Sequence, residues 1–305
     1  MKLTKQVLLF IAAALLFAAC GTTSTVPVTG RKHRISVSDE QVLSLSKQEY
    51  DKYMQTAKKS TNAANTAMVE RVGRRLANAV ETYLKNNGYA DEVKNYSWEF
   101  NLVQNSAANA FCMPGGKIVV YDGLLPYTKD EASLAIVLGH EIAHAVAKHS
   151  AEQLSKQQNQ QVAGQVLSGV LGAVGASSEV SQMAQVGFGL GTQLGNLHYS
   201  RENESEADYM GLIFAAMAGY NPNAAVTFWE RMAQASQNNG PAFLSDHPSD
   251  ASRIAAIKKE LPEAMKYYNA AVAAGKKASA STTTKSKKST RTVHVSSRGK
   301  SSKKR

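Results

Sequence analysis

The sequence predicts an α+β domain that is mostly α, with one small β-sheet. Apolar residues recur at helical spacing along most of the chain, and they alternate with polar residues only near 97–104. No internal repeat is evident, and both ends differ in composition from the middle. We therefore expect a signal peptide at 1–20, a linker at 21–37, one folded domain at 38–274 and a disordered tail at 275–305.

Three short strands are expected near the middle of the domain, between two groups of helices. In the first strand, Trp98, Phe100 and Leu102 alternate with polar residues, which is the pattern of a half-buried strand. The next two strands flank a Pro-Gly-Gly turn at 114–116. The predicted strands span 97–104, 109–113 and 117–121.

Capping patterns and apolar spacing indicate where the helices begin. Ser38 and Gln41 match a capping box, and Thr128 and Glu131 match another just before an apolar run. The helix that follows the second box is expected to continue to about His149. The predicted helices lie at about 38–59, 63–83, 128–149, 201–218 and from 221, with two short ones led by Pro248 and Pro262 and two loosely packed ones in the Gly-rich stretch 152–196.

The first twenty residues have the pattern of a secretory signal. Lys2 and Lys5 precede an apolar run at 7–19, which is shorter than the roughly 20 residues that a membrane-spanning helix needs. Small residues then precede Cys20, as in the bacterial lipobox, where the cysteine is acylated. Gly21 replaces the aspartate associated with inner-membrane retention. We therefore expect a lipid anchor on Cys20 at the outer membrane of a bacterial cell envelope, facing the periplasm.

The other end is strongly basic. Eleven of the 35 Lys and Arg residues lie from Lys276 onward, whereas all 24 Asp and Glu residues precede it. The rest of the chain therefore carries equal numbers of basic and acidic residues and is neutral. Such a tail buries little apolar surface, which predicts disorder. It either binds anionic lipid or cell-wall polymer, or is a solvated extension. No nucleic acid is expected as a partner of an exported chain.

His140, Glu141 and His144 form an HExxH pattern that predicts one zinc ion per chain. Residues four apart lie on the same face of a helix, so both imidazoles can bind one ion while Glu141 contacts a water molecule. A catalytic zinc needs a third protein ligand as well. The metzincin pattern is excluded, because Ser150 stands where its third histidine would be. His149 is interpreted as a surface histidine near the helix C-terminus.

The acidic segment 199–208 offers the best third ligand. Spacing alone does not choose among Glu202, Glu204 and Glu206. One turn after Glu204, Asp208 is placed to accept the second N–H of a zinc-bound histidine and so fix its tautomer.

Five motifs occur in order along the domain: VPVTGR at 26–31, NAFCMPGG at 109–116, HEIAH at 140–144, SRENESEAD at 200–208 and DHPS at 246–249. Together they resemble the HtpX/Ste24 family of zinc peptidases, especially its soluble lipoprotein and periplasmic branch, to which LoiP belongs. The resemblance implies Glu204 as the zinc ligand and Asp208 as its neighbour in the outer shell. It also implies a gluzincin-type domain with a small sheet bordering the active-site cleft.

The same resemblance implies further site residues and a function. His247 and Arg253 are expected near the metal as catalytic residues. His247 either occupies the open metal position in a resting state or stabilises the oxyanion during turnover, and Arg253 serves the same charge. An edge strand is expected to hold the substrate backbone; it comprises Asn109, Ala110, Phe111, Cys112 and Met113. The implied activity is zinc endopeptidase action on unfolded or misfolded envelope proteins. The alternatives are a latent protease that acts as a chaperone-like or assembly-factor lipoprotein, and a cell-wall-binding protein that works through its tail.

Overall fold

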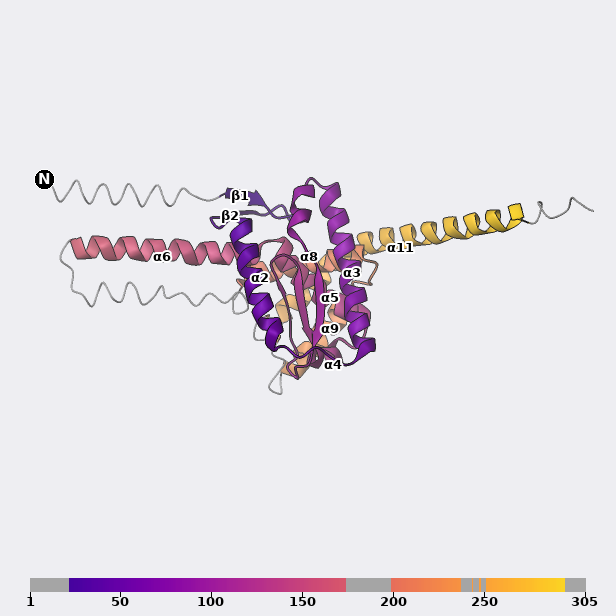
Figure 1. The fold of residues 1–305 in the computed structure, drawn as a ribbon, viewed down its shortest axis with the longest axis horizontal. Helices are drawn as coiled ribbons and strands as arrows, with labels where there is room; N and C mark the ends of the chain where they lie inside the picture. Colours follow the sequence, from indigo (N-terminus) through magenta and orange to yellow (C-terminus); the bar gives the residue numbers. More distant parts are fainter. Residues whose placement is uncertain (1–21, 174–198, 237–242, 244–246, 248–250, 294–305) are drawn as a thin grey trace, which may run out of the picture.

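The computed structural model describes residues 22–173, 199–236, 243, 247 and 251–293 (Figure 1). The predicted signal peptide, with Cys20, lies outside the described residues, as does the Gly-rich stretch from 174 onward. The described part is mostly helical with small sheets, as predicted. Its main helices are α2 (Asp39–Thr56), α3 (Ala63–Asn86), α5 (Glu131–Val146), α6 (His149–Ala173), α8 (Arg201–Met217), α9 (Ala224–Ser236) and α11 (Ala251–Val293).

The larger sheet has three short strands, which agree with the three predicted ones. They are β3 (Glu99–Val103), β4 (Ala110–Met113) and β5 (Lys117–Tyr121), in the order β3-β5-β4. Strand β5 lies in the middle, parallel to β3 and antiparallel to β4. Among the described residues, one edge of β4 therefore has no neighbouring strand, and this edge is on the side of α5.

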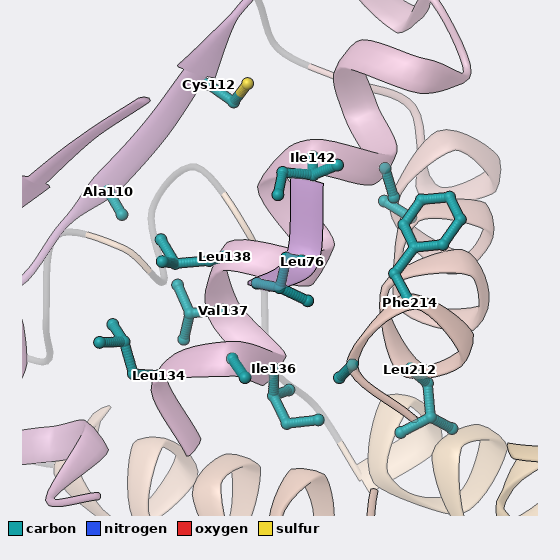
Figure 2. Close-up of a cluster of buried hydrophobic side chains, with 14 of the residues drawn as sticks. Leu76, Ala110, Cys112, Leu134, Ile136, Val137, Leu138, Ile142, Leu212 and Phe214 are labelled. Atoms are coloured by element: carbon teal, nitrogen blue, oxygen red, sulfur yellow. The ribbon is translucent and has the colours of Figure 1, made fainter. Parts of the chain in front are cut away.

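Helix α5 is the centre of the hydrophobic core. From Ser133 to Val146 every residue of the helix is buried. Figure 2 shows the cluster around it: Leu138 and Ile142 of α5 lie among Leu76 of α3, Cys112 of β4 and Phe214 of α8. Apolar residues on all sides of one helix require neighbours on all sides. The HExxH residues therefore sit in the interior of the domain.

Helices α5 and α8 approach each other backbone to backbone. A Cβ atom added to Gly211 of α8 would lie 2.6 Å from the backbone nitrogen of His140, and one added to Gly139 would lie 2.7 Å from the carbonyl oxygen of Gly211. Only glycine allows this approach, because real Cβ contacts are not so short. The pair sets the distance between the HExxH helix and the acidic segment.

Both ends of α5 differ from the prediction. Its N-cap is Asp130, whose side chain accepts the Ser133 N–H, while Thr128 closes the short helix α4 (Leu125–Thr128). The helix also ends at Val146, before His149. Lys148 adopts a left-handed backbone with φ of 56°, which breaks the helix and starts α6 in a new direction. His149 therefore does not lie where a longer α5 would place it.

Residues 21–37 are not the linker that the sequence suggests. Strands β1 (Thr22–Thr25) and β2 (Lys32–Ile35) form an antiparallel hairpin, and the turn between them packs on the domain. Val26 in that turn is fully buried, and Arg31 forms ion pairs with Glu152 and Glu206. An apolar residue and a paired guanidinium fix this segment to the domain. The Ser38–Gln41 capping box that follows is confirmed.

The C-terminal part also differs from the prediction. One helix, α11, replaces the two predicted short ones and contains Pro262. It continues to Val293, into the part for which the sequence predicts disorder, and Figure 1 shows it extending away from the domain. Lysine, which is frequent there, favours helix more than the serine and threonine that surround it. The domain boundary at 274 stays a prediction.

Candidate metal centre

Four buried side chains converge where α5 and α8 meet: His140, His144, Glu204 and His247. Their nitrogen and carboxylate oxygen atoms all lie within 4.8 Å of one another. Helix α8 starts with a capping box between Ser200 and Asn203, which places Glu204 in the first turn. The close backbone approach described above then brings this turn next to the two histidines.

The geometry of these donors fits a zinc ion. Nδ1 of His140 donates to the Asp208 carboxylate at 2.9 Å, so Nε2 of His140 carries a lone pair. That atom lies 3.0 Å from Nε2 of His144. The Glu204 oxygens lie 3.3 Å from His144 and 3.6 Å from His140. Two ligands of a tetrahedral zinc at about 2.0–2.1 Å are roughly 3.3 Å apart, so this set can hold the ion.

Electrostatics favours the forms of these residues that bind metal. Burial lowers the pKa of His140 and holds the pKa of His144 well below its usual range. Burial alone would raise the pKa of Glu204, but its close contacts with His144 and His247 hold it well below its usual range. Neutral imidazoles and an ionised carboxylate are the zinc-binding forms of these side chains.

Asp208 is held by a second donor, which lies beside His140. Arg253 donates through Nη2 to the same carboxylate oxygen at 2.6 Å, and its guanidinium lies over the Trp229 ring at 3.6 Å from the centroid. Burial raises the pKa of Asp208, but the Arg253 charge and the His140 hydrogen bond outweigh it and lower the pKa. Arg253 therefore lies at the site, where its closest acidic partner is Asp208 and Glu204 is 3.5 Å away.

Glu141 lies between the donor set and the edge of β4. The backbone N–H of Cys112 donates to Glu141 Oε2 at 3.2 Å, and Nε2 of His247 lies 3.4 Å from Glu141 Oε1. The turn between β4 and β5 also lines a pocket that includes His144. The predicted edge strand, the predicted base and the predicted metal site are thus contiguous.

His247 belongs to the donor cluster and is also an ionic partner of two carboxylates. Its Nδ1 lies 3.0 Å from Glu204 and 3.1 Å from Nε2 of His140. Burial lowers the pKa of His247, but Glu141 and Glu204 outweigh burial and raise the pKa above its usual value. In this arrangement His247 is placed either to occupy the open position of the metal or to face a substrate oxygen.

An HExxH helix beside further buried donors is how many zinc metallopeptidases hold their metal, and this chain belongs to that class of enzyme. More particularly, it is a member of peptidase family M48, whose family model matches residues 63–261, more than half of the chain. The family accounts for the fold, the zinc and the class of enzyme that the sequence predicts.

Individual relatives support the same conclusion. The chain is 40% identical over 169 residues to the mitochondrial metalloendopeptidase OMA1 of Schizosaccharomyces pombe, covering 55% of this chain and 48% of that protein. It is 30% identical over 245 residues to human OMA1, covering 79% and 46%. It is 31% identical over 172 residues to the β-barrel assembly-enhancing protease of Escherichia coli, covering 55% and 35%. The chain spans less than half the length of these three relatives. The finer likeness to HtpX, Ste24 and LoiP stays a prediction.

The sequence did not predict the roles of three side chains beside the site. His149, expected on the surface, is fully buried, and its Nδ1 lies 2.9 Å from Nδ1 of His144. Glu206 accepts from the other nitrogen of His149, and the Tyr199 ring stacks on His144 at 4.1 Å. The sequence does not show that α5 ends at Val146. Helical spacing continued beyond that residue therefore places His149 wrongly.

Glu260 on α11 leads to a prediction about pH and stability. Among the described residues its Oε2 has no hydrogen-bond partner, and burial, then repulsion from Asp208, raise its pKa to about 7. A carboxyl group whose pKa is raised by folding stabilises the folded state at pH values below its pKa in the unfolded chain. This stability is lost as pH rises through its pKa in the folded state. Since the residue is half-buried, we expect Glu260→Gln to be more stable than the wild type by about 1 kcal/mol near pH 8 and nearly equal near pH 5. Denaturant unfolding checks this, and equal differences at both pH values would contradict it.

Proposed function

We propose that this chain is a zinc-dependent endopeptidase that hydrolyses unfolded or extended proteins of the bacterial cell envelope, as part of protein quality control. The observation that carries the proposal is the edge of β4 beside the donor set. Its Cys112 N–H points at Glu141, away from β5, and so faces the place where a scissile bond would lie. Strand addition holds an extended segment mainly through hydrogen bonds to its backbone.

The chain's own residues have distinct roles in this hydrolysis. His140, His144 and Glu204 hold zinc, which when bound acts as a Lewis acid on water and on a carbonyl group. Glu141 takes a proton from the attacking water and returns it to the leaving amine. His247 donates to the developing oxyanion. Arg253 acts through Asp208, which keeps the Nδ1 proton on His140.

The cellular setting rests on the chain ends and on the names of relatives. The signal pattern and Cys20 favour a lipid-anchored protein at the outer membrane, and the basic tail is proposed to bind anionic lipid or cell-wall polymer. The relative from Escherichia coli is named for enhancing β-barrel assembly. Within the described residues, no helix combines the length and apolar character that crossing a bilayer requires.

The test compares one protein in two states as a substrate. Purified chain loaded with zinc is incubated with native lysozyme and with reduced, alkylated lysozyme, and fragments are counted by mass spectrometry. We expect the unfolded form to be cleaved at least about tenfold faster, because only an extended segment can pair with β4. Stripping zinc with a chelator should stop cleavage, and adding zinc back should restore it.

Two outcomes would contradict this proposal in different ways. Equal or faster cleavage of native lysozyme would exclude selection for extended segments. If zinc-loaded protein does not cleave unfolded lysozyme but still prevents its aggregation, the latent, chaperone-like alternative is favoured. The contacts of His247 with Glu141 and Glu204 favour this alternative, because they hold the His247 side chain beside the metal ligands.

A further inference from the structure

A second histidine pair lies behind the metal site, on the side of His144 that faces away from the ligand cluster. Nδ1 of His149 is 2.9 Å from Nδ1 of His144, and both rings are almost fully buried. When two neutral imidazoles form a hydrogen bond, one nitrogen donates and the other accepts. The contacts of His149 decide which nitrogen carries the proton.

The other nitrogen of His149 faces a carboxylate that only accepts. Nε2 of His149 lies 2.9 Å from Glu206 Oε2, and Glu206 also accepts from Thr29 Oγ1 at 2.5 Å and Arg31 Nε at 2.7 Å. Burial alone would raise the pKa of Glu206, but these three hydrogen bonds lower it. Nε2 of His149 is therefore the donor, and Nδ1 of a neutral His149 is an acceptor.

This order of donors gives the His144 proton an acceptor at Nδ1, which competes with the acceptors beside Nε2, namely Glu204 and the lone pair of His140 Nε2. When Nδ1 of His144 donates to His149, the proton is absent from its Nε2, which is the atom 3.3 Å from Glu204 and 3.0 Å from His140. Nε2 then has a lone pair for the metal. Zinc-bound histidines generally use their second nitrogen in this way, usually towards a carboxylate or a carbonyl group.

We propose that His149 is a positioning residue for zinc binding, which keeps the Nδ1–H tautomer of His144 and is itself oriented by Glu206 and the N-terminal hairpin. The turn containing Thr29 and Arg31 thereby reaches the metal through Glu206, His149 and His144. His140 has its own partner in Asp208, so each zinc-binding histidine is oriented by a separate acidic residue. The inference rests on the proposed role of His144 as a zinc ligand.

The experiment compares two substitutions of similar size in the full chain. In His149→Asn, Oδ1 replaces Nδ1 and still accepts from His144, whereas His149→Leu offers no acceptor. Zinc affinity is measured by competition with a chromophoric chelator, and the stability of the metal-free protein by thermal unfolding. We expect His149→Leu to bind zinc about 10–100-fold more weakly and His149→Asn to stay within about threefold of wild type.

A direct readout of the tautomer separates positioning from simple packing. Nitrogen NMR of ring-labelled histidine in the metal-free protein should show the His144 proton on Nδ1 in wild type and in His149→Asn. In His149→Leu it should move to Nε2, where Glu204 accepts it. A proton already on Nε2 in wild type would overturn the proposal, as would unchanged zinc affinity in His149→Leu.

Failure of the ligand assignment has a different result. If His144→Ala keeps wild-type zinc affinity, His144 is not a ligand and both ideas fail. If His144→Ala loses zinc while His149→Leu does not, the ligand assignment stands and only the role of His149 is wrong. Equal losses in His149→Leu and His149→Asn would also count against the hydrogen bond, because the two differ in the acceptor.

Discussion

Replacement of Glu141 by glutamine is expected to lower kcat/KM for an unfolded substrate by about 10²–10⁴-fold while zinc content stays unchanged. Glutamine has nearly the same shape but cannot take a proton from water. The residue lies beside the ligand cluster, with Cys112 and His247 as its contacts, and is not one of the four clustered donors. The measurement is hydrolysis of reduced, alkylated lysozyme, with zinc quantified in the same preparations.

Glu202→Gln is the matched control for this substitution. Glu202 lies on α8 close to the site in sequence, but its side chain is exposed. The same change from carboxylate to amide there should leave both activity and zinc content at the wild-type level. If Glu141→Gln keeps more than about a tenth of the activity at equal zinc content, another group is the general base.

The central part of the site could be predicted from spacing because it lies within one helix. His140 and His144 are four residues apart, and α5 is regular between them. The third ligand could not be chosen this way, because three glutamates follow one another at intervals of two. The structure shows three different environments: Glu202 is exposed, Glu204 joins the donor cluster, and Glu206 faces the N-terminal hairpin. Residues two apart on a helix do not share a face.

Two errors, those at 21–37 and at His149, arise where contacts distant in sequence overrode local patterns. The segment 21–37 has the composition of a linker, yet Arg31 finds Glu206 far along the chain. His149 has a surface-like sequence context, yet Lys148 turns the backbone and directs it inward. Strands and amphipathic helices were predictable because their periodicity is local. Ion pairs between distant segments leave no such trace in one sequence.

Substitution of Gly211 by alanine is expected to affect both stability and zinc binding. The new Cβ would lie 2.6 Å from the His140 nitrogen and 2.8 Å from the carbonyl carbon of Gly139, and both atoms are backbone. No side chain can move to relieve this contact, so α5 and α8 must separate. We expect a loss of about 3 kcal/mol, or roughly 6–12 °C in the melting temperature.

The same separation should weaken the metal site, because α8 carries Glu204 and Asp208 while α5 carries the histidines. A displacement of this kind is expected to cost on the order of 100-fold in kcat/KM. Gly275→Ala on α11 is the control, since a Cβ there would meet nothing within 4 Å, and it should not reduce either quantity. If Gly211→Ala melts at the wild-type temperature with wild-type zinc affinity, the glycine pair does not set the distance between the helices. The geometry of the site would then have to come from the ligands themselves.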